Sequence, residues 1–243
     1  MLSWPFLLFE DKERLTSGKW LNYRLIEASQ VLLAKYFPDV KRLQSPLFGE
    51  KLAFKRVEGK FVQILNVERL HWITVTNIGC EEGVVMVYDS LFNTMSLNSK
   101  QQICSLYQPT CSQLEFRLAN IQRQPNTADC RLLAIACATE LVQSRDPTCC
   151  NLNVSQMRQH LAMCLESGKM EAFPLRGPRR QPVGRVIKKS IIEPVYCKCR
   201  MLNDPSVAMI CFDKCNEWYH KVCVCVGLDV DMSDKEWFCY KRK

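Results

Sequence analysis

The segment Gln124-Pro-Asn-Thr-Ala-Asp-Cys130 runs directly into residues 132–142, which are almost entirely apolar. Ala and Leu dominate this stretch and it is apolar nearly all round, which predicts a buried helix. Cys130 falls in its first turn, and Asp129 stands at the N-cap position. The positive end of a helix favours a thiolate over a thiol, as does a neighbouring imidazolium. The sequence therefore predicts a reactive cysteine at this helix start.

A histidine and an aspartate that could complete a thiol active site lie upstream. Residues 72–76 and 84–88 are rich in β-branched and aromatic side chains and flank a Gly-containing loop, which predicts an antiparallel hairpin. Folding this hairpin brings His71 and Asp89 opposite one another at facing strand ends, with a register that could slip by a residue or two. A carboxylate there can orient an imidazole beside a nucleophile.

Gln124 lies six positions before Cys130 and offers a side-chain N–H that could stabilise the oxyanion of a tetrahedral intermediate. Taken singly, a cysteine in an apolar stretch or a histidine beside a tryptophan is most often a structural residue. The assignment therefore depends on the four residue types occurring together in one chain.

These residues resemble the ubiquitin-like protease family, papain-like enzymes that cleave after the C-terminal glycines of SUMO-type modifiers. The transposon-associated members resemble the chain most. The resemblance covers roughly residues 15 to 170 and rests on four motifs, namely Trp20-Leu-Asn22, His71-Trp72, Tyr88-Asp89-Ser90, and Gln124-Pro-Asn with Asp129-Cys130. It implies an α+β papain-like catalytic domain over residues 1–172.

The resemblance also implies a role for each matched residue. Cys130 corresponds to the nucleophile, His71 to the general base, Asp89 to the orienting acid and Gln124 to the oxyanion residue. Trp20 and Trp72 correspond to the tryptophans that enclose the substrate's glycine tail. The implied activity is that of a cysteine-type peptidase or isopeptidase acting on a ubiquitin-like modifier.

Two positions depart from the family pattern. The family sequence continues Asp-Cys-Gly, whereas this chain has Arg131, whose bulk is expected beside the nucleophile where the substrate backbone passes. The family's Trp-Leu-Asn-Asp becomes Trp-Leu-Asn-Tyr at Tyr23, which removes an acid that helps SUMO proteases hold the modifier. Two alternatives to an active enzyme stay open: an inactive chromatin- or histone-binding protein that keeps the protease fold, and a decaying transposon-derived chain.

The C-terminal tail carries a second kind of chemistry. Seven of the fifteen cysteines fall from Cys197 onward, in a segment too short to bury a large core. The pairs Cys197-x-Cys199 and His220-x-x-Cys223 together present three thiolates and one imidazole to a tetrahedral ion. A histidine within the cysteine pattern and the lack of a convincing signal peptide favour zinc over disulfides. We therefore expect Zn²⁺ at these four residues.

The tail, residues 193–243, resembles a PHD finger, a cross-braced module with two zinc sites. The match rests on Cys215-Asn-Glu-Trp-Tyr-His-Lys-Val-Cys223 and Trp237-Phe-Cys239. The resemblance implies a second zinc site that uses Cys211, Cys215 and Cys239.

That second site is expected to be incomplete. Phe212 stands where a third ligand belongs, with Cys211 one position early, and Arg242 stands where the last ligand should be. A structural zinc site with an open position binds its metal more weakly.

Resemblance to inhibitor-of-growth-type fingers implies a methyl-lysine cage formed by Tyr196, Met209 and Trp218. Aromatic faces attract a quaternary ammonium through cation–π interactions. The alternative is that Tyr196 and Trp218 pack a very small core. A histone tail is therefore an expected partner besides the ubiquitin-like modifier.

Residues 173–192 are rich in Pro, Gly and cations and predict a linker between the two domains. The linker carries much of the formal net charge of +8. Such a basic run can direct a protein to the nucleus, contact nucleic acid nonspecifically or keep a tether solvated, and the charge alone does not choose among these. We expect a nuclear location and no specific contact with nucleic acid. The apolar N-terminal residues 2–9 are too short to span a membrane.

Further elements follow from periodicity. Residues 21–36 and 157–170 predict helices, and residues 61–67 and 114–118 predict strands.

Overall fold

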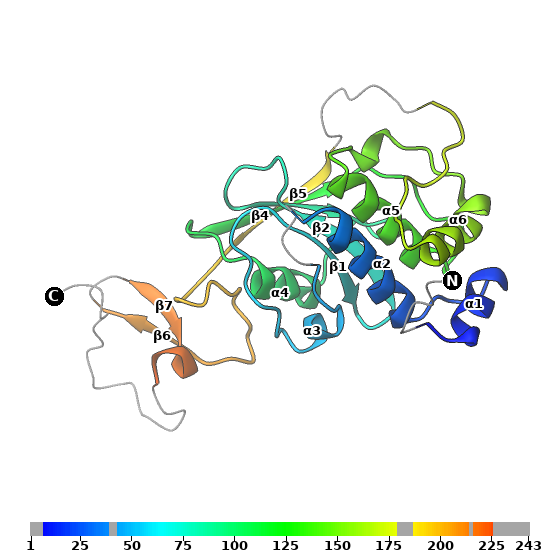
Figure 1. Cartoon of the computed structure of the whole chain (residues 1–243). Coiled ribbons are helices and arrows are strands. Elements are labelled where there is room, and N and C mark those ends of the chain that lie inside the picture. Colours follow the sequence, from blue (N-terminus) through cyan, green and yellow to red (C-terminus); the bar gives the residue numbers. More distant parts are fainter. Residues whose placement is uncertain (1–6, 39–42, 179–186, 214–215, 226–243) are drawn as a thin grey trace.

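The structure is a computed structural model and describes residues 7–38, 43–178, 187–213 and 216–225 of the chain. Its centre is a five-stranded sheet in the order β1-β2-β3-β4-β5 (Figure 1). The strands are β1 (Val62–Val67), β2 (His71–Thr76), β3 (Val84–Tyr88), β4 (Gln113–Ala119) and β5 (Ile187–Pro194). Only the β3–β4 pair is parallel; the other neighbours are antiparallel.

Helices cover both faces of this sheet. One face packs against α1 (Phe9–Thr16), α2 (Tyr23–Tyr36), α5 (Cys130–Val142) and α6 (Val154–Ser167). The other face packs against α4 (Leu97–Leu106), with α3 (Leu47–Glu50) beside it. All residues of α5 are buried, as its uniformly apolar sequence predicts. The result is the expected α+β architecture, with the start of α5 placed against the central sheet.

The predicted elements are present with shifted ends. The helix predicted at 157–170 starts three residues earlier, as α6, and ends at Gly168 in the left-handed conformation that a glycine C-cap adopts. The hairpin register is offset by two residues, within the slip of a residue or two that the sequence leaves open. Thr74 pairs with Tyr88, so His71 lies two positions away from a direct pairing with Asp89. Only the length of the two side chains brings them together.

The predicted linker is partly a strand. Residues 187–192, the C-terminal part of segment 173–192, belong to β5, which pairs with β4 along its length. Its side chains are mostly exposed, so its composition resembles that of a solvated tether. Backbone pairing with β4 supplies the order that composition did not indicate.

The C-terminal unit follows β5 directly. Its two-stranded sheet consists of β6 (Met209–Phe212) and β7 (Glu217–His220), drawn in orange at the left of Figure 1. Two of its side chains, Val195 and Leu202, join the hydrophobic core around α4. The C-terminal unit therefore shares a core with the larger domain.

Within the described ranges, no helix has both the length and the apolar character that a bilayer crossing requires.

Candidate functional site

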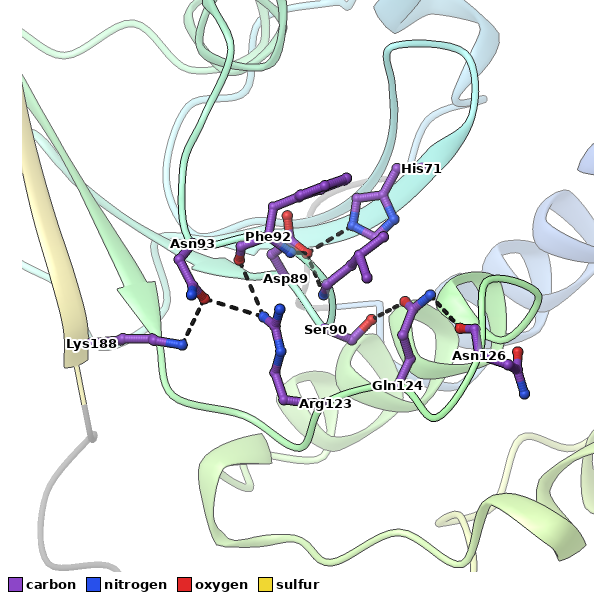
Figure 2. A network of polar contacts seen from close by, with 10 residues as sticks. His71, Asp89, Ser90, Phe92, Asn93, Arg123, Gln124, Asn126 and Lys188 are labelled. Carbon is purple, nitrogen blue, oxygen red and sulfur yellow. Dashed lines mark hydrogen bonds and ion pairs between the residues drawn. The ribbon is translucent and has the colours of Figure 1, made fainter.

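Cys130, His71 and Asp89 meet where α5 starts beside the sheet. The Nε2 atom of His71 lies 2.7 Å from the Oδ1 atom of Asp89 (Figure 2). Cys130 lies close enough to His71 to help raise the pKa of the imidazole. The histidine is 5% exposed and Cys130 only 1% exposed. The arrangement is thus a thiol, an imidazole and a carboxylate in series, shielded from water.

The surroundings of His71 favour its protonated form. Burial lowers the pKa of His71, but the hydrogen bonds and charges of Asp89 and Cys130 outweigh burial and raise this pKa to about 9. An imidazolium beside a cysteine at a helix N-terminus favours the nucleophilic thiolate.

This pKa has a measurable consequence. We expect the His71 ring resonance to titrate near pH 9 in NMR spectra, and Asp89→Asn to move the midpoint down, since the amide removes the opposing charge. Because the pKa of His71 is higher in the folded chain than in the unfolded chain, this residue adds on the order of 2–3 kcal/mol to the free energy of unfolding. This contribution is fully present below about pH 6.5 and is lost as the pH rises through 9. An unchanged midpoint in Asp89→Asn would contradict this electrostatic account.

The loop after β3 holds Asp89 in place. Its Oδ1 atom accepts hydrogen bonds from the backbone N–H groups of Leu91 at 2.7 Å and Phe92 at 2.8 Å. The Phe92 ring stands edge-on to the imidazole, with centroids 5.0 Å apart and an interplanar angle of 84°. The carboxylate and the imidazole are therefore both fixed from the same loop (Figure 2).

The side-chain amide of Gln124 is oriented by two contacts. Ser90 donates its hydroxyl to Oε1 of Gln124 at 2.7 Å, and Nε2 donates to the carbonyl of Asn126 at 2.6 Å. A primary amide has two N–H groups, so one remains for a ligand. Asn126 also donates to Asp129 at 2.7 Å, which ties the loop to the start of α5. The side chain of Asp129 stands at the N-cap but makes no capping bond.

Arg158 is a site-positioning residue that sequence reasoning missed. It donates to the carbonyl of Lys19 at 2.9 Å and to Oδ1 of Asp129 at 3.0 Å. It thereby connects the loop before Trp20 to the residue before Cys130. A lone arginine on a predicted helix, with no motif around it, gave no signal for this contact.

Trp20 and Trp72 both contact one side chain, that of Arg131. The guanidinium carbon of Arg131 lies 5.2 Å from the ring centroid of Trp20 and 5.3 Å from that of Trp72. Such cation–π contacts contribute about 0.5–2 kcal/mol each and offset part of the cost of burying the cation. Burial lowers the pKa of this guanidinium. The side chain expected to obstruct the substrate path thus contacts both tryptophans.

Cys197, Cys199, His220 and Cys223 form a cluster in the C-terminal unit. Their ligand atoms all lie within 4.8 Å of one another, and Sγ of Cys199 is 3.2 Å from Nδ1 of His220. Tetrahedral zinc with bonds of about 2.1–2.3 Å separates its ligands by roughly 3.5–3.8 Å. The donor set and spacing therefore fit a structural zinc ion.

The expected second zinc site is only partly visible, because Cys215 and Cys239 lie outside the described residues. Cys211 is half-buried on β6 and belongs to no metal-ligand cluster within the described ranges. Phe212 is instead 3% exposed and packs edge-on against Tyr219, with centroids 4.7 Å apart. An aromatic core contact thus occupies the position where the resemblance implied a ligand.

The three expected cage residues separate into two groups. Tyr196 and Trp218 line a groove of about 400 Å³ that also contacts the start of β4, and Trp218 is 48% exposed. Met209 pairs with His220 across β6 and β7 and is not among the described residues that line this groove. The groove therefore keeps two of the three expected cage residues and has a third aromatic residue, Tyr219, in its lining.

Comparison with solved structures identifies the fold. The chain is similar to SUMO protease Ulp1 with its catalytic cysteine oxidised to a sulfinic acid, with 14% identity, a TM-score of 0.55 and coverage of 66% of this chain and 84% of that one. It is also similar to the C-terminal Ulp1 protease domain in complex with Smt3, the yeast orthologue of SUMO, with 15% identity, a TM-score of 0.54 and coverage of 65% and 82%. No family model matches the chain, and no curated protein matches it. The fold is that of the Ulp1 protease domain.

Proposed function

We propose that the chain is a cysteine-type peptidase or isopeptidase that acts on a ubiquitin-like modifier. The observation that carries the proposal is the placement of Cys130, at the start of a buried helix, beside the hydrogen-bonded pair His71 and Asp89. The fold supports it, because Ulp1 is a SUMO protease with the same fold.

In the proposed mechanism, the thiolate of Cys130 attacks the carbonyl carbon of the scissile peptide or isopeptide bond. The tetrahedral oxyanion accepts hydrogen bonds from the free N–H of Gln124 and the backbone N–H of Cys130. His71 gives its proton to the leaving amine, and Asp89 stabilises and orients the imidazolium. Water then hydrolyses the thioester, with His71 as the general base, and releases the modifier's C-terminal carboxylate.

Hydrolysis of modifier C-terminal amides tests the proposal. The substrates are SUMO, ubiquitin and related modifiers, each with a fluorogenic amine at the C-terminus. We expect the chain to cleave one of them, so that its kcat/KM differs between the modifiers. No cleavage of any of them by the native chain would contradict the proposal.

A second candidate function is favoured by one observation. Arg131 contacts both Trp20 and Trp72, and Cys130 is buried beside it. A protein that keeps the fold and binds without turnover would show these features. This binding function would be supported if the Arg131→Gly variant cleaves a modifier and the native chain cleaves none.

We further propose that residues 193–243 form a PHD-type zinc finger that reads a histone tail in the nucleus. The ligand cluster and the groove walled by Tyr196 and Trp218 support this proposal. The groove is also lined by Glu217, which suits a cationic ligand, and by Lys198 and Arg200, which oppose one.

Peptide titration tests the histone proposal. Trimethyl-lysine histone-tail peptides are expected to bind roughly five- to thirtyfold more tightly than unmethylated ones. The reason is that the unmethylated peptides lack about 1–2 kcal/mol of cation–π attraction. Trp218→Ala should remove this preference, whereas Val222→Ala, another exposed apolar residue of the unit, should retain it. Equal binding of both peptides to the native chain would rule the proposal out.

A further inference from the structure

Arg131 and Trp72, which are in cation–π contact, carry three buried hydrogen-bond donors between them. Nε and Nη1 of Arg131 and Nε1 of Trp72 are buried, and none of them has a hydrogen-bond acceptor among the described residues. Buried donors are normally paired, because an unpaired donor loses its hydration without compensation. Arg131 is 9% exposed, so water reaches little of it. A ligand for these donors should therefore bring acceptor atoms.

The charge of Arg131 is also unbalanced. Other arginines of the described chain, Arg24, Arg117 and Arg145, each form an ion pair with a carboxylate. None of the ion pairs found among the described residues includes Arg131. A buried cation without a carboxylate partner is costly, and the charge of Cys130 and the π faces of Trp20 and Trp72 compensate it only in part. The ligand should therefore be an anion.

The position of the cation selects the kind of anion. Arg131 is the second residue of α5, directly after the proposed nucleophile. An extended peptide that reaches Cys130 must pass beside Arg131. A glycine tail offers only neutral carbonyls there, whereas a carboxylate supplies both the charge and the acceptor atoms.

We propose that Trp20, Trp72 and Arg131 form a carboxylate-binding site for the end of a peptide chain. The proposal rests on the proposed function, because it assumes that a peptide approaches Cys130. Two sources supply the same chemistry: the free C-terminal carboxylate of a released modifier, and an aspartate or glutamate side chain just before the scissile bond. Either source would give Arg131 the carboxylate that it lacks among the described residues.

The test uses the full chain with Cys130→Ala, so that binding is measured without turnover. The probes are three acetylated tetrapeptides: one ending in Gly-Gly with a free carboxylate, the same peptide as its C-terminal amide, and a third amide with Asp as its last residue. Calorimetry gives the affinities, and the indole N–H resonance of Trp72 reports local binding. The free acid is expected to bind at least about tenfold more tightly than the Gly-Gly amide, as a charge-assisted hydrogen bond predicts.

The third peptide distinguishes the two sources. Tight binding of the Asp amide assigns the site to an acidic side chain, and binding of the free acid alone assigns it to the chain terminus. Equal affinity of all three peptides, or no binding of any, would overturn the proposal.

A matched pair of variants tests whether Arg131 is the receptor. Arg131→Gln is expected to equalise the affinities for acid and amide, and Arg131→Lys to retain part of the difference, because it keeps the charge but loses the planar donors. If Arg131→Gln does not fold, the salt dependence in the chain with Arg131 gives the same information: high salt should weaken binding of the acid and leave the amide unchanged. Acid selectivity that persists in folded Arg131→Gln would reject the assignment.

These outcomes are separate from those of the proposed function. Modifier cleavage by native Cys130 without any acid selectivity would reject only the carboxylate site. Acid selectivity in a chain that cleaves no modifier would reject only the enzyme.

Discussion

Cys130→Ala is expected to reduce kcat/KM for the modifier C-terminal amide by at least about 10⁴-fold, which removes measurable cleavage. The reason is that the proposed reaction passes through a thioester on this sulfur, and no other group in contact with His71 and Asp89 can replace it. The measurement is release of the fluorogenic amine by the variant and by the native chain, with the modifier that the native chain cleaves best.

Cys137→Ala is the matched control for this prediction. Cys137 lies on the same helix, is 3% exposed and has a pKa raised by burial, which keeps it as an unreactive thiol. Its replacement should leave kcat/KM within about threefold of native, with a stability cost of roughly 1 kcal/mol. Comparable losses in both variants would indicate damage to α5 rather than removal of a nucleophile.

Loss of the zinc ligand set is the second large effect that we expect. Cys199→Ser should lower the zinc content from one ion per chain towards zero and unfold the C-terminal unit, with a loss of at least about 3 kcal/mol, since zinc binding and folding are coupled in such small units. Val195 and Leu202 belong to the core around α4, so the melting temperature of the larger domain should also fall. Metal analysis and thermal unfolding measure both quantities.

Cys211→Ser provides the comparison for the zinc prediction. Cys211 is half-buried on β6 and stands apart from the ligand cluster, so this variant should retain its zinc and most of its stability. Zinc loss in Cys211→Ser equal to that in Cys199→Ser would contradict the assignment of the cluster. Two equally tight zinc ions in the native chain would contradict the expectation that the second site is weak.

The contact between His71 and Asp89 could be predicted from local patterns. Alternating β-branched residues and a Gly-containing loop specify a hairpin, and the side chains at its open end are then near each other. The register could not be predicted, because the turn loop is long and does not fix the pairing. The side chains of His71 and Asp89 reach across the two-residue difference.

Contacts between distant segments could not be read from the sequence. Arg158 joins Lys19 to Asp129, and strand β5 pairs with β4 although its composition is that of a tether. Both depend on tertiary packing that leaves no local periodicity.

The environment of Arg131 could be predicted in part. Its bulk beside Cys130 was evident from the sequence, but the cation–π contacts with Trp20 and Trp72 required the assembled fold.

The most direct test of the central claim is covalent labelling by ubiquitin-like modifiers that carry a C-terminal electrophile. The purified chain is incubated with SUMO, ubiquitin and related probes, next to Cys130→Ala and Arg131→Gly, and the adducts are mapped by mass spectrometry. We predict a single adduct at Cys130 with one class of modifier, faster in Arg131→Gly and missing in Cys130→Ala. Adducts that persist in Cys130→Ala, or no adduct in either chain that retains Cys130, would contradict the assignment of a thiol protease.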